Sequence, residues 1–449
     1  MERERLGSRL GFIMLSAGCA IGVGNVWKFP YMTGLYGGGA FVLIYLLCLV
    51  LLGVPVMTME FAMGRASRKS PVKLYEELEP KGSKWHIHGY FAMAGNYILM
   101  FFYTVVTGWM LRYFVDMATG KFAGTSVEQV ESRFGEMLEQ PVSMILYMGI
   151  VVILGMLVCS KGVQKGVEKV TKVMMVALLV IMIILAINSV FLPGALEGVK
   201  FYLIPDLQRM KDIGIVNVIV GAMNQSFFTL SLGIGAMAIF GSYIGKERTL
   251  FGESVNVAVL DTFVAICAGM IIFPACFAYG VQPDSGPNLI FVTLPNIFNN
   301  IPLGRLWGSL FFVFMSFAAF STIIAVFENI IACCIDLFGW TRKKACLVNT
   351  VILFALSVPC ALGYNVWSGF SIAGKGIMDL EDFAVSNILL PLGSLVYVLF
   401  CVSRYGWGWN KFIAEANEGK GLKIAKWMRL YMTFVIPVLI IAIFIMGIL

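Results

Sequence analysis

A repeated pattern of long apolar segments constrains this chain more than any other feature. The hydrocarbon core of a bilayer is about 30 Å thick, so a helix needs about 20 mostly apolar residues to cross it. Eleven such segments can be placed, at residues 10–33, 38–64, 89–116, 142–159, 167–192, 214–244, 254–281, 306–335, 345–363, 385–403 and 430–448. The pattern predicts an all-α polytopic membrane protein with 11 transmembrane helices, because lipid offers no partner to unpaired backbone groups.

The composition agrees with this class of protein. Hydrophobic residues make up 59% of the 449 residues and charged residues 13%, and the mean hydropathy is +0.85, which excludes an ordinary soluble domain. The formal charge of +7 does not indicate a nucleic-acid partner, because the basic residues recur between the apolar segments and form no single patch. We expect a lipid bilayer around the chain, no nucleic acid and no obligate protein partner.

The cysteines show no pattern of redox or metal-binding sites, and the first apolar segment shows no signal-peptide cleavage site. All ten cysteines lie in or beside apolar segments, with no CxxC pair and no histidine cluster. We interpret them as small core residues, with neither a disulfide framework nor a metal site. The first apolar segment runs into a glycine-rich stretch without a small-residue cleavage site, so the N-terminus is expected to be kept.

The basic residues predict the orientation of the chain in the cell (plasma) membrane. Most of the 33 lysines and arginines lie in alternate connections, beginning with Arg3, Arg5 and Arg9, and connections of this kind stay in the cytoplasm. The N-terminus is therefore expected to be cytoplasmic and the C-terminus extracellular. On the outer face we expect a glutamate-rich loop at 120–140 and a re-entrant hairpin at 283–302 that caps a vestibule.

Two of the apolar segments are interrupted by glycine and polar residues at the depth of the bilayer. The first break lies in Ala17–Pro30 and the second in Gln225–Gly235. Unwound backbone at this depth survives only where it lines a cavity or binds a ligand, although a glycine-rich helix packed tightly against its neighbours is an alternative for the first segment. Broken segments in corresponding halves indicate a transporter with an inverted repeat. We expect a single transporter domain over 1–449, with repeat one at about 10–192, repeat two at about 214–403 and an extra helix at about 430–448.

Three motifs carry a resemblance to a known family. The first is GVGNVWKFP at 22–30 with GGGAF at 37–41, the second is FFTLSLGIG at 227–235, and the third is FSTIIAVFEN at 320–329. In this order they resemble the neurotransmitter:sodium symporter family, in its bacterial eleven-helix branch. The resemblance implies a LeuT-type fold, with a 5+5 inverted repeat, broken helices 1 and 6 and one extra helix. It also implies sodium-coupled import of an amino acid by alternating access.

The resemblance further implies two sodium sites and no organic cofactor. The first site would combine the carboxylate of the substrate with the Ala20 carbonyl, Asn25, Thr229 and Asp261. The second would combine the carbonyl groups and hydroxyls of Gly18, Ile21, Ala318, Ser321 and Thr322. Without the family match, the two hydroxyls would be interpreted as bonding back to their own helix.

Asp261 departs from the asparagine that most of the family has at this position. In chloride-dependent members an anion balances the sodium charge, and Tyr45, Gln225 and Thr229 match its binding set, while Ala265 replaces a serine. A unit charge pair at 4 Å is worth about 4 kcal/mol at an effective dielectric constant of about 20, enough to replace a bound anion. We expect chloride-independent transport. Asp261 either takes a proton on the empty return step or stays ionised as a structural carboxylate.

The substrate is expected to be a hydrophobic or aromatic amino acid. Gly22 stands where monoamine-transporting relatives carry an aspartate for the substrate amine, so the carboxylate of the substrate would be bound by sodium, by backbone N–H groups near Gly24 and by the Tyr103 hydroxyl. A charged substrate side chain would be left unpaired. The expected lining residues and their neighbours are Cys19, Ala20, Gly22, Gly24, Leu99, Tyr103, Phe228, Thr229, Ser231, Ile234, Thr322 and Val326.

Two gates are implied by the resemblance. Lys28 and Asp382 match the outer ion pair, although relatives generally use arginine at position 28 and lysine makes no bidentate fork. Tyr103 and Phe228 would form an aromatic lid below this pair. The inner gate would comprise Arg3, Tyr243 and Asp336, with Leu6 in place of the usual tryptophan. Each charge has the alternative of a solvated interfacial residue. The intramembrane Glu60 and Glu328 are expected to pair structurally within the bundle.

Two other classes of function compete with a transporter. A membrane-embedded enzyme would need paired catalytic groups, but the only two histidines, His86 and His88, lie beside basic residues without a nucleophile, so no enzyme activity is expected. A sensor of the same fold that binds an amino acid without transporting it would keep every binding residue and stays open. The sequence leaves undetermined the particular amino acid, the sodium stoichiometry, proton antiport and the oligomeric state.

Overall fold

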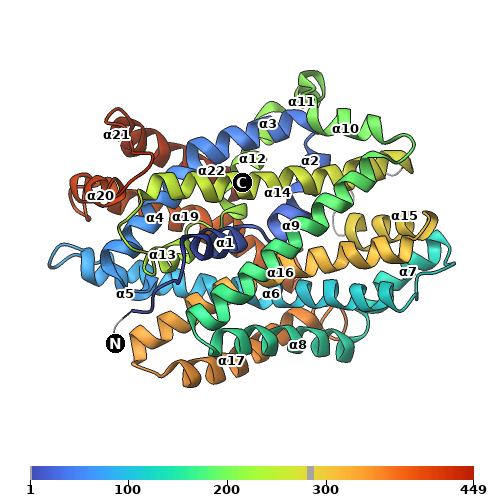
Figure 1. The fold of residues 1–449 in the computed structure, drawn as a ribbon, viewed down its shortest axis with the longest axis horizontal. Coiled ribbons are helices and arrows are strands. Elements are labelled where there is room, and N and C mark those ends of the chain that lie inside the picture. The colour runs from blue at the N-terminus through green and yellow to red at the C-terminus, as the bar shows by residue number, and fades with distance from the viewer. Residues whose placement is uncertain (1–2, 281–287, 449) are drawn as a thin grey trace.

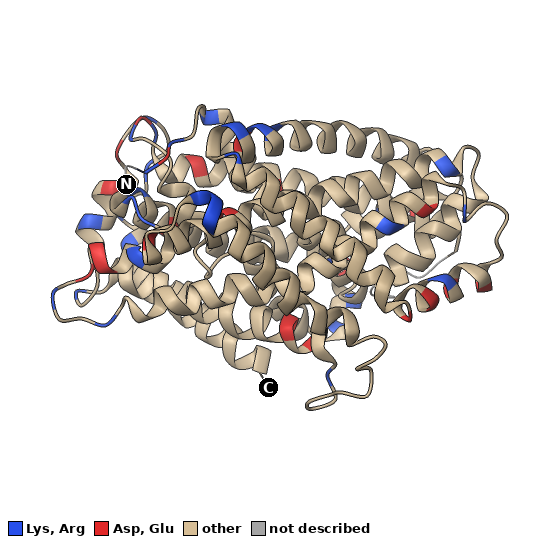
Figure 2. Ribbon diagram, turned by 90° about the horizontal axis from the view of Figure 1, so that it is seen from below, with Lys and Arg blue, Asp and Glu red and all other residues tan. Residues whose placement is uncertain are grey.

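The computed structural model describes residues 3–280 and 288–448, and this part of the chain is almost entirely helical. Within these ranges the only β-structure is a pair of isolated bridges, Arg248 with Lys420 and Ile372 with Lys375. Long helices run roughly along the longest axis of the molecule (Figure 1). Charged residues gather toward the two ends of this bundle and leave its middle mostly uncharged (Figure 2). This distribution fits a bundle whose middle lies in lipid.

Nine helices of the described chain are long and apolar enough to cross a membrane. They are α3 to α4 through η2 (Gly39–Ser67), α6 (Ile87–Ala118), α8 (Pro141–Ser160), η3 with α9 (Val163–Val190), α14 (Leu250–Ala278), α16 (Gly304–Phe338), α17 (Arg342–Leu362), α18 to α19 through η5 (Ile377–Val402) and α21 to α22 through η6 (Met428–Ile448). All nine fall on expected segments. The predicted multi-pass, all-helical membrane class is confirmed.

The remaining two expected segments are the broken ones. The first comprises α1 (Arg9–Ala20) and the pair η1 with α2 (Gly24–Leu35), which bend by 52° and count as a tenth span if they cross together. The second comprises α12 (Ile215–Thr229) and α13 (Ala236–Gly241), of which α12 is a shorter apolar helix. The total of eleven spans therefore stays a prediction.

Shorter helices connect the spans at their ends. They are α5 (Pro71–Leu78), α7 (Val127–Leu138), α10 (Ala195–Leu203), α11 (Leu207–Ile213), α15 (Leu294–Asn300) and α20 (Trp409–Ala416). The expected glutamate-rich loop contains α7, whose start is stabilised by a capping box between Ser126 and Gln129.

The expected re-entrant hairpin at 283–302 begins outside the described residues. Its described part forms η4 (Leu289–Thr293) and α15, which pack on α16. Phe291 of η4 stacks on Phe134 of α7 with ring centroids 5.1 Å apart, and meets Trp27 of the first broken span edge-on at 5.9 Å. This segment therefore covers the part of the first broken span that contains Trp27.

The first break comes from glycines that approach neighbouring side chains closely. The α1 helix ends at Ala20, and Ile21 adopts an extended conformation with ψ of 90° before the chain becomes helical again at Gly24. A Cβ atom at Gly22 would overlap the Tyr103 hydroxyl and the Thr322 hydroxyl. Only glycine leaves room for these groups beside the unwound backbone.

The second break is a turn from Leu230 to Gly235 that includes left-handed backbone. Ser231 has φ of 50° and Gly233 has φ of 94°, a conformation that glycine adopts without strain. Glu60 of α4 accepts the Gly233 N–H at 2.6 Å, and Asn96 of α6 donates to the Ile234 carbonyl at 2.8 Å. Buried polar side chains thus satisfy backbone groups that the break releases.

Candidate functional site between the two helix breaks

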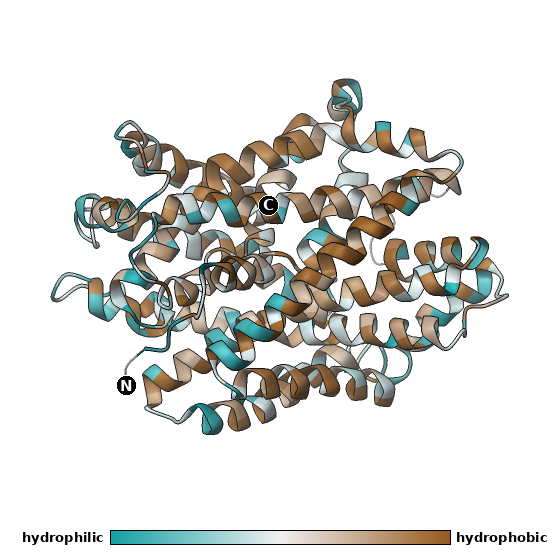
Figure 3. Cartoon of the chain, in the orientation of Figure 1, coloured by the Kyte–Doolittle hydropathy of each residue, from teal (hydrophilic) through white to brown (hydrophobic). Residues whose placement is uncertain are grey.

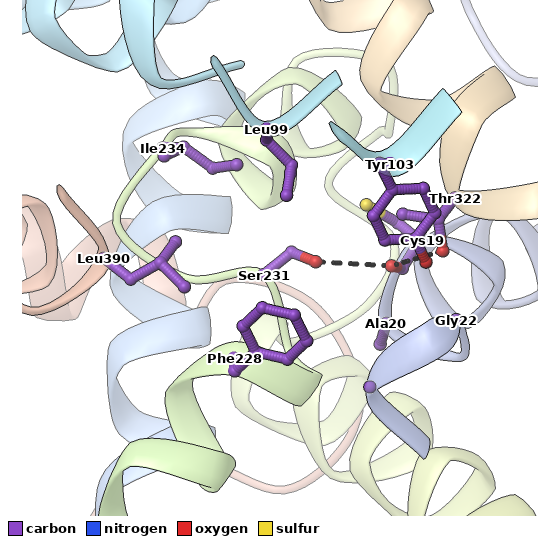
Figure 4. Close-up of a pocket in the computed structure, with 11 residues that line it drawn as sticks. Cys19, Ala20, Gly22, Leu99, Tyr103, Phe228, Ser231, Ile234, Thr322 and Leu390 are labelled. Atoms are coloured by element: carbon purple, nitrogen blue, oxygen red, sulfur yellow. Dashed lines mark hydrogen bonds between the residues drawn. The ribbon is translucent and has the colours of Figure 1, made fainter. Parts of the chain in front are cut away.

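A small cavity lies between the two breaks, deep in the bundle (Figure 4). Its free volume of about 10 Å³ is enough for about one water molecule. None of the described residues that line it carries a charge. They are Cys19, Ala20, Gly22, Gly24, Leu99, Tyr103, Phe228, Ser231, Ile234, Thr322 and Leu390. This set combines both breaks with α6, α16 and α19.

The expected lining differs from the structure at three positions. Val326 lies one turn beyond Thr322 on α16 and is fully buried, but it does not line the cavity. Thr229 does not line the cavity, because it lies in a polar cluster with Asn25 and Asp261. Leu390 of α19 was missed, because a leucine in a long apolar segment carries no sequence signal that distinguishes lining from packing.

Hydroxyl groups hold the unwound backbone at the edge of the cavity. Tyr103 accepts the Val23 N–H at 2.8 Å. Ser231 donates to the Cys19 carbonyl at 3.3 Å and Thr322 donates to the same carbonyl at 3.2 Å (Figure 4). Oxygen atoms from three different elements therefore converge where α1 ends.

The first expected cation set forms a buried polar cluster around Asp261 of α14. Asn25 donates to the Asp261 carboxylate at 2.9 Å, and Thr229 donates to the Asn25 side-chain oxygen at 2.8 Å. Tyr45 donates to the same carboxylate at 3.3 Å. Ala20, the remaining member of this set, lines the cavity.

The charge of Asp261 has no basic partner among the described residues. The side chain is fully buried, and no described lysine or arginine lies within ion-pair distance of it. Gln225 donates to the Gly24 carbonyl at 2.8 Å, while its own side-chain oxygen is buried without a partner. A buried carboxylate of this kind is strongly unfavourable unless a cation or a proton neutralises it.

The second expected cation set also converges, around the end of α1. The Ser321 hydroxyl lies 2.8 Å from the Gly18 carbonyl, 2.8 Å from the Ala318 carbonyl and 3.4 Å from the Ile21 carbonyl. Thr322 donates to the Gly18 carbonyl at 3.2 Å. These five oxygen donors are of the type that hard cations prefer, and carbonyls of an unwound helix are known cation ligands.

One side of the cavity, which we expect to be the outer side, is closed by Lys28 and Asp382. The Lys28 ammonium lies 3.3 Å from the carboxylate and 3.0 Å from the Ser386 hydroxyl. It also lies 3.9 Å from the centre of the Phe228 ring, so the ion pair and the aromatic side chain meet directly. A polar depression of about 400 Å³ opens outside this contact.

The opposite side, which we expect to be the inner side, is covered by the N-terminal segment. Arg3 pairs with Asp336 at 3.1 Å and lies over the Tyr243 ring at 5.0 Å. Tyr243 donates to Glu328 at 2.6 Å, and Arg342 pairs with the same carboxylate at 2.6 Å. The expected inner set therefore comes together, and Glu328 pairs structurally as expected, with Arg342 as its basic partner.

Two acidic residues that anchor the N-terminal segment were missed. Glu168, at the start of α9, accepts the Gly7 N–H at 2.7 Å and the Ser8 hydroxyl at 2.8 Å. Glu4 pairs with Arg342 at 2.8 Å and accepts the Val163 N–H at 2.9 Å. The sequence offered one indication of the role of Glu168, which is a single glutamate among lysines at the start of an apolar span.

The sequence of this chain matches a known protein family. A family model described as the sodium:neurotransmitter symporter family matches residues 3–133 and 125–449. The chain is 36% identical over 440 residues to the uncharacterized sodium-dependent transporter YhdH of Bacillus subtilis, covering 97% of this chain and 96% of that protein. It is 32% identical over 457 residues to an uncharacterized sodium-dependent transporter of Haemophilus influenzae, covering 99% and 98%.

A solved structure agrees with these sequence matches. The crystal structure of MhsT in complex with L-phenylalanine matches with a TM-score of 0.90 at 37% identity, covering 99% of this chain and 100% of that chain. The resemblance that the three motifs carry is thereby confirmed. The chain belongs to the sodium:neurotransmitter symporter family of sodium-dependent membrane transporters.

Proposed function

We propose that this protein is a symporter that uses sodium to import a hydrophobic or aromatic amino acid. The observation that carries the proposal is an uncharged cavity between two helix breaks, flanked by two groups of converging oxygen atoms. The binding of L-phenylalanine by the similar protein MhsT supports the substrate class. A membrane enzyme is not favoured, because the relatives are described as transporters.

The substrate would lie with its carboxylate toward the first break. Tyr103 and the backbone near Gly24 would receive this carboxylate, while Leu99, Phe228 and Ile234 would surround the side chain. The cavity has room for about one water molecule, which is less than an amino acid needs, so Phe228 and its neighbours would move outward to admit the substrate. Phe228 is half-buried and contacts the Lys28 ammonium, so we expect this side chain to move when the cavity opens.

Two sodium ions would flank the substrate. The first would bind the Ala20 carbonyl, Asn25, Thr229, Asp261 and the substrate carboxylate. The second would bind the oxygen atoms of Gly18, Ile21, Ala318, Ser321 and Thr322. Because the substrate carboxylate completes the first set, each ligand strengthens the binding of the other, which is the basis of coupled transport.

Transport would be independent of chloride. Asp261 supplies a negative charge within hydrogen-bond distance of Tyr45 and Thr229, while Gln225 donates to the Gly24 carbonyl next to Asn25. Ala265, one turn further along α14, has no hydroxyl with which to bind an anion. The fixed carboxylate thereby takes the place of an added counter-ion, and stays ionised or accepts a proton after sodium leaves.

The driving force is sufficient for accumulation. Moving one charge through about 100 mV yields about 2.3 kcal/mol, and a tenfold sodium gradient adds about 1.4 kcal/mol. One coupled ion therefore supports a concentration ratio of several hundredfold. Alternating access would open the Lys28–Asp382 contact and the Arg3–Asp336 contact in turn, with repeat one at 10–192 and repeat two at 214–403 as the moving halves.

We further propose that the N-terminal face is cytoplasmic. Arg3, Arg5 and Arg68 gather on this face, and burial together with Arg5 and Arg3 lowers the pKa of Arg68 from its ordinary value. A concentration of positive charge beside the membrane-spanning segments is typical of the cytoplasmic side. The C-terminal helix would then end outside.

Uptake into proteoliposomes tests this function. An inward sodium gradient is expected to drive accumulation of labelled L-phenylalanine, with potassium in place of sodium as the control and gluconate in place of chloride as the anion test. Accumulation that stops in gluconate would contradict chloride independence alone. Sodium-dependent binding without accumulation would identify a sensor of the same fold and overturn the transport proposal.

A further inference from the structure

A surface groove lies where the N-terminal segment meets the start of α9, away from the central cavity. Its volume is about 720 Å³. The α9 helix crosses the front of the bundle in Figure 1 with no other long helix over it, and only 33% of its most apolar window is buried. The lining residues are Gly7, Gln164, Glu168, Lys169, Lys172, Val173, Val176 and Ala177.

The polar end of this groove carries uncompensated positive charge. Lys169 and Lys172 make no ion pair with any residue that the structure describes. Glu168 is the single carboxylate in the lining, and its two oxygens are already taken by the Gly7 N–H and the Ser8 hydroxyl at 2.7 and 2.8 Å. With two lysines and one glutamate, the lining has a net charge of about +1. A phosphate diester carries one negative charge and would neutralise it.

The other end of the groove is apolar and faces outward. Val173 is 64% exposed and Val176 is 49% exposed. The same face continues through Val180 and Ile183, which are 53% and 43% exposed. From Lys172 to Ile183 the helix rises about 16 Å, which is about half of a bilayer core of about 30 Å. In Figure 3 the start of α9 is hydrophilic, and most of the following surface is hydrophobic.

We propose that this groove binds an anionic phospholipid of the phosphatidylglycerol type. The phosphate would lie between Lys169 and Lys172, and one acyl chain would follow Val173 and Val176 along α9. Basic pockets next to apolar helix surfaces at the edge of a membrane bind acidic head groups, and lysine side chains reach the interface while their stems cover apolar surface. The site is separate from the proposed transport cavity and does not depend on it.

Native mass spectrometry of the detergent-purified protein tests the proposal. Titration with phosphatidylglycerol is expected to give one tightly retained lipid, whereas phosphatidylcholine binds weakly. The double variant K169Q/K172Q is expected to weaken phosphatidylglycerol binding by about 30-fold, from about 1 kcal/mol for each basic side chain near an anionic surface. The matched control is K343Q/K344Q, which removes two lysines at the start of α17.

A second pair of variants tests the acyl-chain part of the site. Val173→Ser with Val176→Ser is expected to weaken lipid binding at least threefold, while Ile187→Ser, which changes an exposed residue further along the same helix, leaves it unchanged. Inorganic phosphate at millimolar concentration is expected not to displace the lipid, which separates a lipid site from a phosphate site. Equal retention by K169Q/K172Q and wild type, or equal affinity for both lipids, would overturn the proposal.

Discussion

Asp261 is the residue whose chemistry most restricts how this transporter works. Its carboxylate is buried, accepts hydrogen bonds from Asn25 and Tyr45, and has no basic partner among the described residues. Removing an ionised carboxylate from water is strongly unfavourable unless an opposite charge lies nearby. A cation bound by this cluster would provide that charge. After the cation leaves, Asp261 would take up a proton or accept a hydrogen bond from a water molecule.

We predict that Asp261→Asn lowers the affinity for sodium at least tenfold with little change in shape. The reason is the loss of a charge interaction of up to about 4 kcal/mol at an effective dielectric constant of about 20. Sodium-dependent binding of labelled L-phenylalanine measures the effect. Asp212→Asn, on the exposed helix α11, is the matched control. An unchanged sodium dependence in Asp261→Asn would show that the carboxylate does not contact the ion.

Among the elements, the N-terminal segment is held more firmly than a terminal segment usually is. Gly7 and Ser8 both donate to Glu168, and Ser8 also caps α1 by accepting the Gly11 N–H at 3.0 Å. Leu6 donates its N–H to the Tyr243 carbonyl at 3.2 Å. The Gly7 N–H and the Ser8 hydroxyl thus hold this segment to Glu168, although Leu6 stands in place of the expected tryptophan.

We predict that Glu168→Gln loosens this segment without unfolding the bundle. A hydrogen bond to a charged group contributes about 1.5–3 kcal/mol, and an amide keeps only one acceptor oxygen for two donors. Amide hydrogen exchange at residues 5–12 is therefore expected to become about tenfold faster or more. Glu197→Gln, at the opposite end of the bundle on α10, is the matched control. Exchange equal to wild type would show that Glu168 is not the anchor.

At the scale of the whole molecule, the two ion pairs proposed as gates are both formed, one on each side of the central cavity. The Lys28–Asp382 contact is 3.3 Å and the Arg3–Asp336 contact is 3.1 Å. The two breaks between these gates belong to different halves of the chain. A ligand that bridges both breaks would therefore couple the motion of one half to the motion of the other.

We predict that sodium and L-phenylalanine stabilise the folded protein cooperatively. A ligand at 100 times its dissociation constant stabilises the folded state by about 2.7 kcal/mol, and a shared carboxylate adds a coupling term. The melting temperature is expected to rise more with both ligands than the sum of the two separate shifts. Potassium at equal ionic strength is the control. Strictly additive shifts would contradict direct contact between the ion and the substrate.

Local sequence was sufficient for the fold class, the location of both breaks and the residues gathered around them. Gly22 and the glycines near position 233 mark backbone that an ordinary helix cannot provide. Asn25 and Thr229 lie within the family motifs, and Asp261 follows from the resemblance although it lies outside those motifs. The structure brings these residues within hydrogen-bond distance of one another. Contacts between distant segments were harder to predict. The residues around Leu390 or Glu168 in the sequence do not indicate which distant residues these side chains contact.

The sequence by itself determined that this chain spans a membrane, where its helices are interrupted and which polar groups the interruptions expose, because those properties follow from apolar length and from glycine at fixed positions. Only the tertiary structure decided that Val326 turns away while Leu390 lines the cavity, and that Glu168 holds the N-terminal segment. These outcomes depend on how α9, α16 and α19 pack against the breaks. That packing is set by side-chain shape across the whole bundle, which no short stretch of sequence contains.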